Sequence, residues 1–183
     1  MARFAFLSGF LSLLLPLLIA AVSATNKNDT NLMLWGCSST TNRALCLNYL
    51  RSDPRSFAAG SYTELGKIMA GFAMAKAKDT LSYVTKLSGP GGRMTGKAAV
   101  SGLETCRRGY SRIISVHIPN ALRTLPVAGE EEASRRLGDA IGEEVGCEEA
   151  VGKSRVKSLL TKRNKDFHDV TILAQDLWFL VWG

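Results

Sequence analysis

The chain has 183 residues, a formal net charge of +7, four cysteines and only two histidines. This length suits one domain built around a single hydrophobic core. No Cys-x-x-Cys spacing occurs, which argues against a zinc site, and lysine and arginine are not interleaved with aromatic residues as nucleic-acid binding favours. The excess of positive charge predicts either attraction to anionic surfaces, such as acidic polysaccharide, or an ordinary solvated basic face.

Residues 1–24 have the pattern of a cleavable secretory signal peptide. Arg3 supplies a positive start, residues 4–22 are apolar and rich in leucine, and residues 22–24 (Val-Ser-Ala) form a small-residue peptidase site. Because Pro16 interrupts the apolar run and no stop-transfer sequence follows, a membrane-spanning helix is the weaker alternative. We therefore expect a secreted chain of 159 residues (183 minus 24) that carries a charge of +6 (22 minus 16) and is free of the membrane.

The start of the mature chain carries signals of an extracellular protein. A sequon for N-glycosylation begins at Asn28, in a polar stretch just after the cleavage site. In a secreted chain, an even number of cysteines indicates disulfides, here two, and metal ligation is the alternative. Four cysteines allow three pairings.

Helical periodicity dominates from residue 57 onward. We expect a first helix from Ser56 to Leu87, which ends at the Ser-Gly-Pro-Gly-Gly run of residues 88–92. A second helix begins near Thr95, and Pro119 should kink or end it because proline lacks a backbone donor. The inward positions are Leu65, Met69, Phe72, Ala73, Ala77, Leu81 and Val84 in the first helix, and Ala99, Leu103, Cys106, Tyr110, Ile113 and His117 in the second.

Two further helices follow a break at residues 125–129. The third runs from Glu130, where three acids suit a helix start, to about Val151. The last, over residues 156–181, repeats apolar residues at steps of four and three, with Arg163 as one polar interruption. The inward positions are Ala133, Leu137, Ala140 and Cys147 in the third helix, and Val156, Leu160, Phe167, Val170, Ala174, Leu177 and Val181 in the fourth. Trp178, Phe179 and Trp182 widen the last stripe, so we expect this end to be docked.

Four helices joined by short polar breaks predict an all-α fold, an up-down-up-down four-helix bundle. Cys106 lies in the second predicted helix and Cys147 near the end of the third. Antiparallel neighbours bring these two levels together, as a disulfide requires. Pairing of either cysteine with Cys37 or Cys46 remains open at this point.

The cysteines stand in a specific context. Cys37 and Cys46 enclose eight residues, and the run from Cys46 to Ser56 reads CLNYLRSDPRS, with a Ser-Asp-Pro box at residues 52–54. Forty residues separate Cys106 from Cys147, Tyr110 stands four residues after the former, and Glu148 follows the latter. In this order, these residues resemble the plant invertase and pectin methylesterase inhibitor family over essentially the whole mature chain.

The resemblance implies both a fold and a function. It implies a short helical hairpin over residues 25–55 ahead of a four-helix bundle over residues 56–183, with the first cysteine joined to the second and the third to the fourth. Members of the family are not enzymes. They form a stoichiometric complex that covers the active-site cleft of a cell-wall or vacuolar hydrolase, and a rigid helix face suits this task because it loses little entropy on docking.

The target implied by the resemblance is a pectin methylesterase. Invertase inhibitors of the family carry Pro-Lys-Phe ahead of the third cysteine, whereas residues 89–94 here read Gly-Pro-Gly-Gly-Arg-Met. The proline is retained but lysine and phenylalanine do not follow it, which favours a pectin methylesterase over an invertase. A third alternative is a bundle that binds anionic pectin or a receptor without inhibiting an enzyme. The invertase of the second alternative would be a cell-wall or vacuolar one. We expect the chain to be extracellular, in the cell wall, or apoplast.

The resemblance also places the contact surface mainly on the middle bundle helices. For each residue singly, an ordinary solvated position is the alternative, because hot spots are few. The outward residues would be Arg107, Arg108, Ser111, Arg112 and Ser115 on the second helix, and Glu131, Arg135, Asp139 and Glu143 on the third.

No pattern in the sequence indicates catalysis. Gly-x-Ser-x-Gly, a Gly-rich phosphate loop and His-Glu-x-x-His are all absent. His117 falls on an apolar stripe and is expected in the core, and His168 is expected at the surface. Asp53 and Pro54 suit the entry to the first bundle helix, where the carboxylate can accept from free amides. We therefore expect neither an enzyme nor a bound metal or cofactor.

Overall fold

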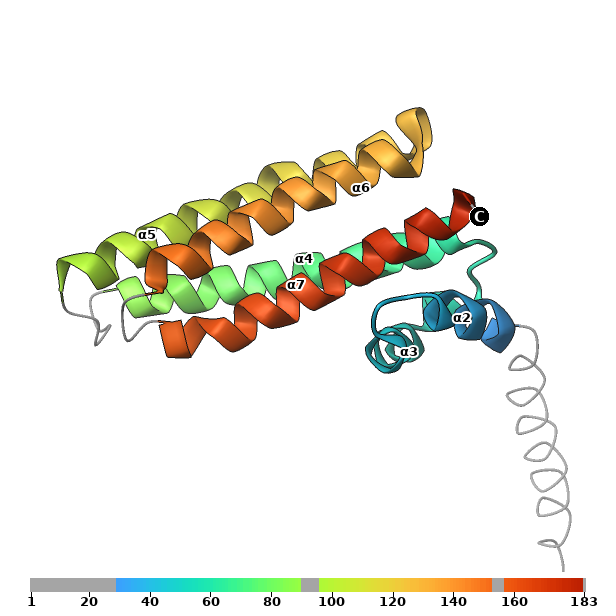
Figure 1. The fold of residues 1–183 in the computed structure, drawn as a ribbon, viewed down its shortest axis with the longest axis horizontal. Coiled ribbons are helices and arrows are strands. Elements are labelled where there is room, and N and C mark those ends of the chain that lie inside the picture. The colour runs from blue at the N-terminus through green and yellow to red at the C-terminus, as the bar shows by residue number, and fades with distance from the viewer. Residues whose placement is uncertain (1–28, 90–95, 153–156, 183) are drawn as a thin grey trace, which may run out of the picture.

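The computed structural model describes residues 29–89, 96–152 and 157–182, and over these residues the chain is all-α. The elements in chain order are α2 (Asp29–Ser38), α3 (Arg43–Ser52), η1 (Pro54–Phe57), α4 (Tyr62–Ser88), α5 (Lys97–Arg112), η2 (Ile113–His117), α6 (Ile118–Val151), α7 (Lys157–Phe179) and η3 (Leu180–Trp182). Figure 1 shows a four-helix bundle with the α2–α3 hairpin at one end, which confirms the predicted fold class.

Several sequence predictions concern residues outside the described ranges. These are the signal peptide of residues 1–24, the Asn28 sequon, most of the segment that replaces Pro-Lys-Phe (residues 90–94) and the inward position Val156. Among the described helices, none has the length and apolar character needed to cross a bilayer.

The α2–α3 hairpin is closed by a disulfide between Cys37 and Cys46, as the family resemblance implied. Both cysteines are fully buried. The loop between the helices is fixed to α7, because the backbone amide and the hydroxyl of Thr41 both donate to Oδ2 of Asp176, at 2.9 and 2.8 Å. The hairpin is therefore attached to the bundle as well as stapled to itself.

The first bundle helix begins later than predicted. Asp53 does act as a cap, but its Oδ1 accepts from the Arg55 amide and caps the single 3₁₀ turn η1 rather than the bundle helix. The helix α4 starts at Tyr62 because Ser61 Oγ accepts from the Glu64 amide. The Glu64 carboxylate in turn accepts from the Gly60 amide at 2.7 Å. This Ser-x-x-Glu capping arrangement sets the start of the helix.

The second bundle helix passes through Pro119 without ending there, so of the two outcomes predicted at this proline, a kink or an end, the end does not occur. Before the proline the backbone changes to a π-helical turn, η2, and the Ile118 amide donates to the carbonyl of Ile113. This extra residue per turn lets the helix absorb a residue that has no amide and whose ring would clash with an α-helical carbonyl. The chain turns only at Gly129, where φ is 81°.

The element α6 therefore contains two antiparallel helices on either side of Gly129. We call residues 97–128, which include α5 and η2, helix B, and residues 130–151 helix C. The predicted break at residues 125–129 and the start at Glu130 agree with this turn. In Figure 1 helices B and C form one pair beside α4 and α7.

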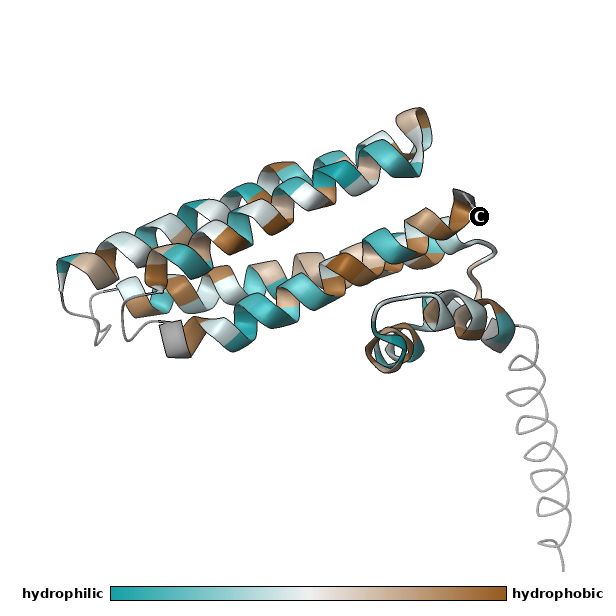
Figure 2. Cartoon of the chain, in the orientation of Figure 1, coloured by the Kyte–Doolittle hydropathy of each residue, from teal (hydrophilic) through white to brown (hydrophobic). Residues whose placement is uncertain are grey.

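The predicted apolar stripes supply most of the core. Figure 2 shows hydrophilic residues along the outward faces of the helices. At the C-terminus the prediction is only partly right: Trp178 is fully buried, but Phe179 is 53% exposed and Val181 is 49% exposed. A helix that buries Trp178 turns the next residue about 100° away, toward solvent. The Trp182 side chain lies outside the description.

Candidate functional site

The site expected from the sequence is the outward face of helices B and C. Helix B is basic, with five lysines and arginines against one acid, Glu104, whereas helix C has eight acids against Arg135 and Arg136. The basic residues of helix B are Lys97, Arg107, Arg108, Arg112 and Arg123. The two adjacent helices thus present charges of opposite sign.

Helices B and C approach each other closely enough to form one rigid unit. A disulfide joins Cys106 to Cys147 with a Cα–Cα distance of 4.4 Å, as the resemblance implied. Gly102 and Gly109 flank it, and a Cβ on Gly102 would lie 2.7 Å from the carbonyl oxygen of Ala150. Glycine is required at Gly102 because any side chain would push the helices apart.

Three of the predicted surface arginines are held by ion pairs within the molecule. Arg107 binds Glu104 at 2.7 Å, and Arg135 binds Glu132 at 2.6 Å, each along its own helix. Arg112 binds Glu143 at 2.9 Å and so connects helix B with helix C. The structure therefore brings Arg112 and Glu143, both predicted site residues, into direct contact.

The other predicted residues differ in their surroundings. Arg108 is exposed and forms no ion pair within the described residues. Ser115 donates to the carbonyl of Ser111 one turn earlier, and Asp139 is half-buried. Glu131 lines a concavity next to α7, and Arg135 lines the same concavity. Arg108, Arg112 and Ser115, at steps of four and three, share one stripe of helix B.

Helix C carries a glycine stripe that was not predicted from the sequence. Gly138, Gly142 and Gly146 recur at every fourth residue, and a Cβ on Gly142 or Gly146 would meet no atom within 4 Å in the part of the chain that the structure describes. Packing inside the protein does not require these two glycines, although each costs a helix about 1 kcal/mol relative to alanine. The spacing alone could have revealed the stripe, which leaves helix C flat enough for another surface to approach its backbone.

Hydrogen bonds keep the surface charges ionised in acid. The bidentate contact with Arg135, together with Arg136, lowers the pKa of Glu132 to about 2. A hydrogen bond from Arg107 likewise lowers the pKa of Glu104. These carboxylates therefore retain their charge at mildly acidic pH.

Beneath the surface lies a polar cluster that the sequence analysis did not anticipate. The Tyr110 hydroxyl donates to Oδ1 of Asn164 at 2.9 Å, and the Asn164 amide donates to Glu148 at 2.6 Å. Nδ1 of His168 lies 2.9 Å from Oε2 of Glu144. Burial raises the pKa of Glu144 against the opposing effect of His168. This cluster ties helices B and C to α7.

The two histidines lie roughly where the sequence placed them. His117 is 9% exposed, and its Nε2 lies 3.5 Å from Oε1 of Glu143. The His168 side chain is 40% exposed and is engaged by Glu144. Within the described ranges, no cluster of three or more His, Cys, Asp or Glu side chains could hold a metal ion.

A disulfide-bonded helical bundle with a rigid, preformed and charged helix face has the build of a protein that recognises other macromolecules. Residues 31–177 match the model of the plant invertase/pectin methylesterase inhibitor family. The chain therefore belongs to this family, whose members are inhibitor proteins.

Solved structures agree with the family match in fold. A mutant form of a pectin methylesterase inhibitor from Arabidopsis is 19% identical, with a TM-score of 0.65, and the match covers 79% of this chain and 93% of that chain. A pectin methylesterase inhibitor from Arabidopsis thaliana is 20% identical with a TM-score of 0.58 and the same coverage. No curated protein sequence matches the chain.

Proposed function

We propose that this inhibitor acts on a pectin methylesterase and blocks its active-site cleft in a one-to-one complex, with the B–C face against the enzyme. The family match carries the proposal, and the sequence of residues 89–94, which lacks the Pro-Lys-Phe of invertase inhibitors, supports this target. The face offers preordered charges and an exposed glycine stripe, which together suit docking against a preformed cleft.

The proposal includes the cellular setting. Residues 1–24 direct secretion and are removed, and residues 25–183 act in the cell wall as an inhibitor domain without catalytic activity or cofactor. Asn28 is the candidate glycosylation site. The basic charge adds salt-sensitive attraction to anionic pectin, the substrate matrix of the target.

The target is tested by titrating oxidised mature protein against a plant pectin methylesterase and a cell-wall invertase at mildly acidic pH. We expect complete loss of methylesterase activity at one equivalent, with the invertase unaffected. Inhibition of the invertase alone would assign the other target of the family. Binding to pectin that falls with salt and has no fixed ratio, without inhibition of either enzyme, would favour the polysaccharide alternative.

The face is tested with two matched glycine substitutions. Gly142→Arg on helix C and Gly71→Arg on α4 each place a Cβ where no atom of the described structure lies within 4 Å, so both variants should fold. If helix C contacts the enzyme, Gly142→Arg should weaken inhibition by about tenfold or more, and Gly71→Arg should leave inhibition unchanged. The reverse result would move the contact surface to α4.

A further inference from the structure

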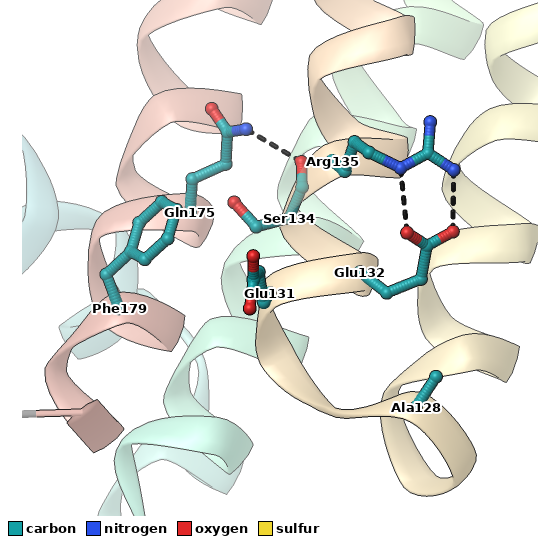
Figure 3. A pocket seen from close by; sticks show the side chains of 7 residues that line it. All are labelled: Ala128, Glu131, Glu132, Ser134, Arg135, Gln175 and Phe179. Atoms are coloured by element: carbon teal, nitrogen blue, oxygen red, sulfur yellow. Dashed lines mark hydrogen bonds and ion pairs between the residues drawn. The ribbon is translucent and has the colours of Figure 1, made fainter.

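The structure contains a concavity that the proposed B–C contact does not explain. It has a volume of about 400 Å³ and lies between the start of helix C and the C-terminal end of α7. We call it the notch. Figure 3 shows Glu131 and Ser134 of helix C facing Gln175 and Phe179 of α7 across it.

The notch offers hydrogen-bond acceptors that remain available. The Gln175 side chain uses Nε2 to donate to the carbonyl of Ser134 at 2.8 Å, which leaves its Oε1 as an acceptor. Oγ of Ser134 is buried and has no hydrogen-bond partner among the described residues, and the residue is only 1% exposed. The exposed Glu131 carboxylate forms no ion pair within the described residues. A buried polar group without a partner in the described structure, such as the Ser134 hydroxyl, is unusual in a folded protein.

The neighbouring Glu132 is different because its charge is already compensated. Its two carboxylate oxygens accept hydrogen bonds from Nη2 and Nε of Arg135 at 2.6 and 2.7 Å, and Nη2 of Arg136 lies 2.9 Å from Oε1. Figure 3 shows the Arg135 contact as two parallel hydrogen bonds directed away from α7. Glu131 is therefore the acid of the notch whose charge has no partner in the described structure.

Phe179 completes the notch with an aromatic surface. The residue is 53% exposed, although the sequence pattern placed it on a docked stripe. Its ring lies beside Gln175 in Figure 3. An aromatic face attracts a guanidinium group, and the apolar stem of a long cationic side chain can cover the ring.

We propose that the notch binds an arginine side chain. The guanidinium group would donate to Glu131 and to Oε1 of Gln175, with the stem against the Phe179 ring. Arginine fits better than lysine because its planar group donates to several acceptors at once and stacks on aromatic rings. We assign this arginine to a loop of the hydrolase partner, because the notch lies at one end of helix C. This assignment rests on the proposed function, in which helix C contacts the enzyme.

The first test does not depend on the enzyme. Oxidised, ¹⁵N-labelled mature protein is titrated with N-acetyl-arginine amide and, as a neutral control of the same shape, N-acetyl-citrulline amide, and amide chemical shifts are followed. We expect saturable shifts at residues 131–135 and 175–179 with the arginine compound, at least several-fold weaker with citrulline. Glu131→Gln should abolish the preference, and Glu149→Gln, at an exposed acid further along helix C, should retain it.

The second test measures inhibition of pectin methylesterase. Glu131→Gln and Phe179→Ala should each weaken inhibition about tenfold, as is typical of a hot-spot contact, and Glu149→Gln should not. Suppose that the wild-type protein inhibits the enzyme, that neither substitution changes this inhibition, and that the arginine and citrulline compounds give equal shifts. This result would overturn the proposed arginine site but leave the proposed function. Arginine-selective shifts in a protein that inhibits neither hydrolase would overturn the proposed function but leave the arginine site.

Discussion

Replacing Gly66 with alanine tests how α4 and α7 pack. A Cβ at this position would lie 2.3 Å from both Cδ1 and Nε1 of Trp178, whereas ordinary contacts begin at 3.4 Å. The indole ring would therefore have to retreat by about 1.1 Å (3.4 minus 2.3). Trp178 is fully buried, and its Nε1 donates to the carbonyl of Thr63 at 3.2 Å, so the ring cannot move without disturbing its neighbours.

The expected loss of stability is the sum of two destabilising contributions and one stabilising contribution. Overpacking a buried site costs about 1–3 kcal/mol, and weakening the indole hydrogen bond costs about 1 kcal/mol. Alanine in place of glycine within a helix returns about 1 kcal/mol. The free energy of unfolding should fall by about 2 kcal/mol, which for a chain of this size lowers Tm by roughly 4–8 °C.

The assay is urea and thermal unfolding followed by circular dichroism, with Gly71→Ala as the matched control. Gly71 lies on the same helix, and a Cβ added there would have no atom of the described structure within 4 Å, so its substitution should raise Tm by about 2–4 °C. In a Trp178→Leu background, Gly66→Ala should lose most of its cost. Equal stability of the Gly66→Ala and Gly71→Ala variants would refute the packing argument.

Two further predictions concern buried charge and the disulfides. Because burial raises the pKa of Glu144, its contribution to stability is fully present below the unfolded value of about 4.5 and is lost as pH rises through the folded pKa. Glu144→Gln should therefore gain stability relative to wild type as pH rises above about 4.5, measured by urea unfolding between about pH 4 and 8, and a constant difference would contradict this. Serine at Cys106 and Cys147 should cost about 4 kcal/mol and at Cys37 and Cys46 about 2.6 kcal/mol, because the bridges span 41 and 9 residues. Equal losses in unfolding free energy would argue against this entropic account.

The fold could be predicted from the sequence where local periodicity and core packing act in the same direction. The inward residues of four helices stood at regular steps, and the break before Glu130 was marked by proline, glycine and then three acids. The start of the first helix was predicted too early because the Ser-Asp-Pro box competed with the capping pair Ser61 and Glu64. That pair is itself visible in the sequence, and it set the observed boundary.

Pro119 shows a different kind of error. The rule that proline ends a helix holds for an α-helical hydrogen-bond ladder, but the ladder here changes to a π-helical turn before the proline. Ile113, His117 and Ile118 are all buried, so this turn packs against the rest of the bundle. No pattern in one segment reports what the rest of the bundle requires of it.

The candidate site was less accessible to sequence reasoning because surface roles depend on which charges are already paired. Helical spacing identified Arg107 and Arg135 as outward residues, and both are, but each is engaged by a glutamate three residues earlier. Glu131 was grouped with the B–C face, whereas the structure places it beside Phe179. Periodicity predicts which face of a helix points outward, but only the packed structure shows which residues lie next to a given side chain.

The distinction between paired and unpaired charges bears on how an inhibitor of this build gains specificity. The Arg112–Glu143 ion pair, the Cys106–Cys147 disulfide and the close contact at Gly102 hold helices B and C in one arrangement before any partner arrives. Side chains held in this way lose little entropy on binding, but their charges are already satisfied and gain little from a new partner. We infer that discrimination between partners depends mainly on exposed groups that form no ion pair in the described structure, above all Arg108 and Glu131.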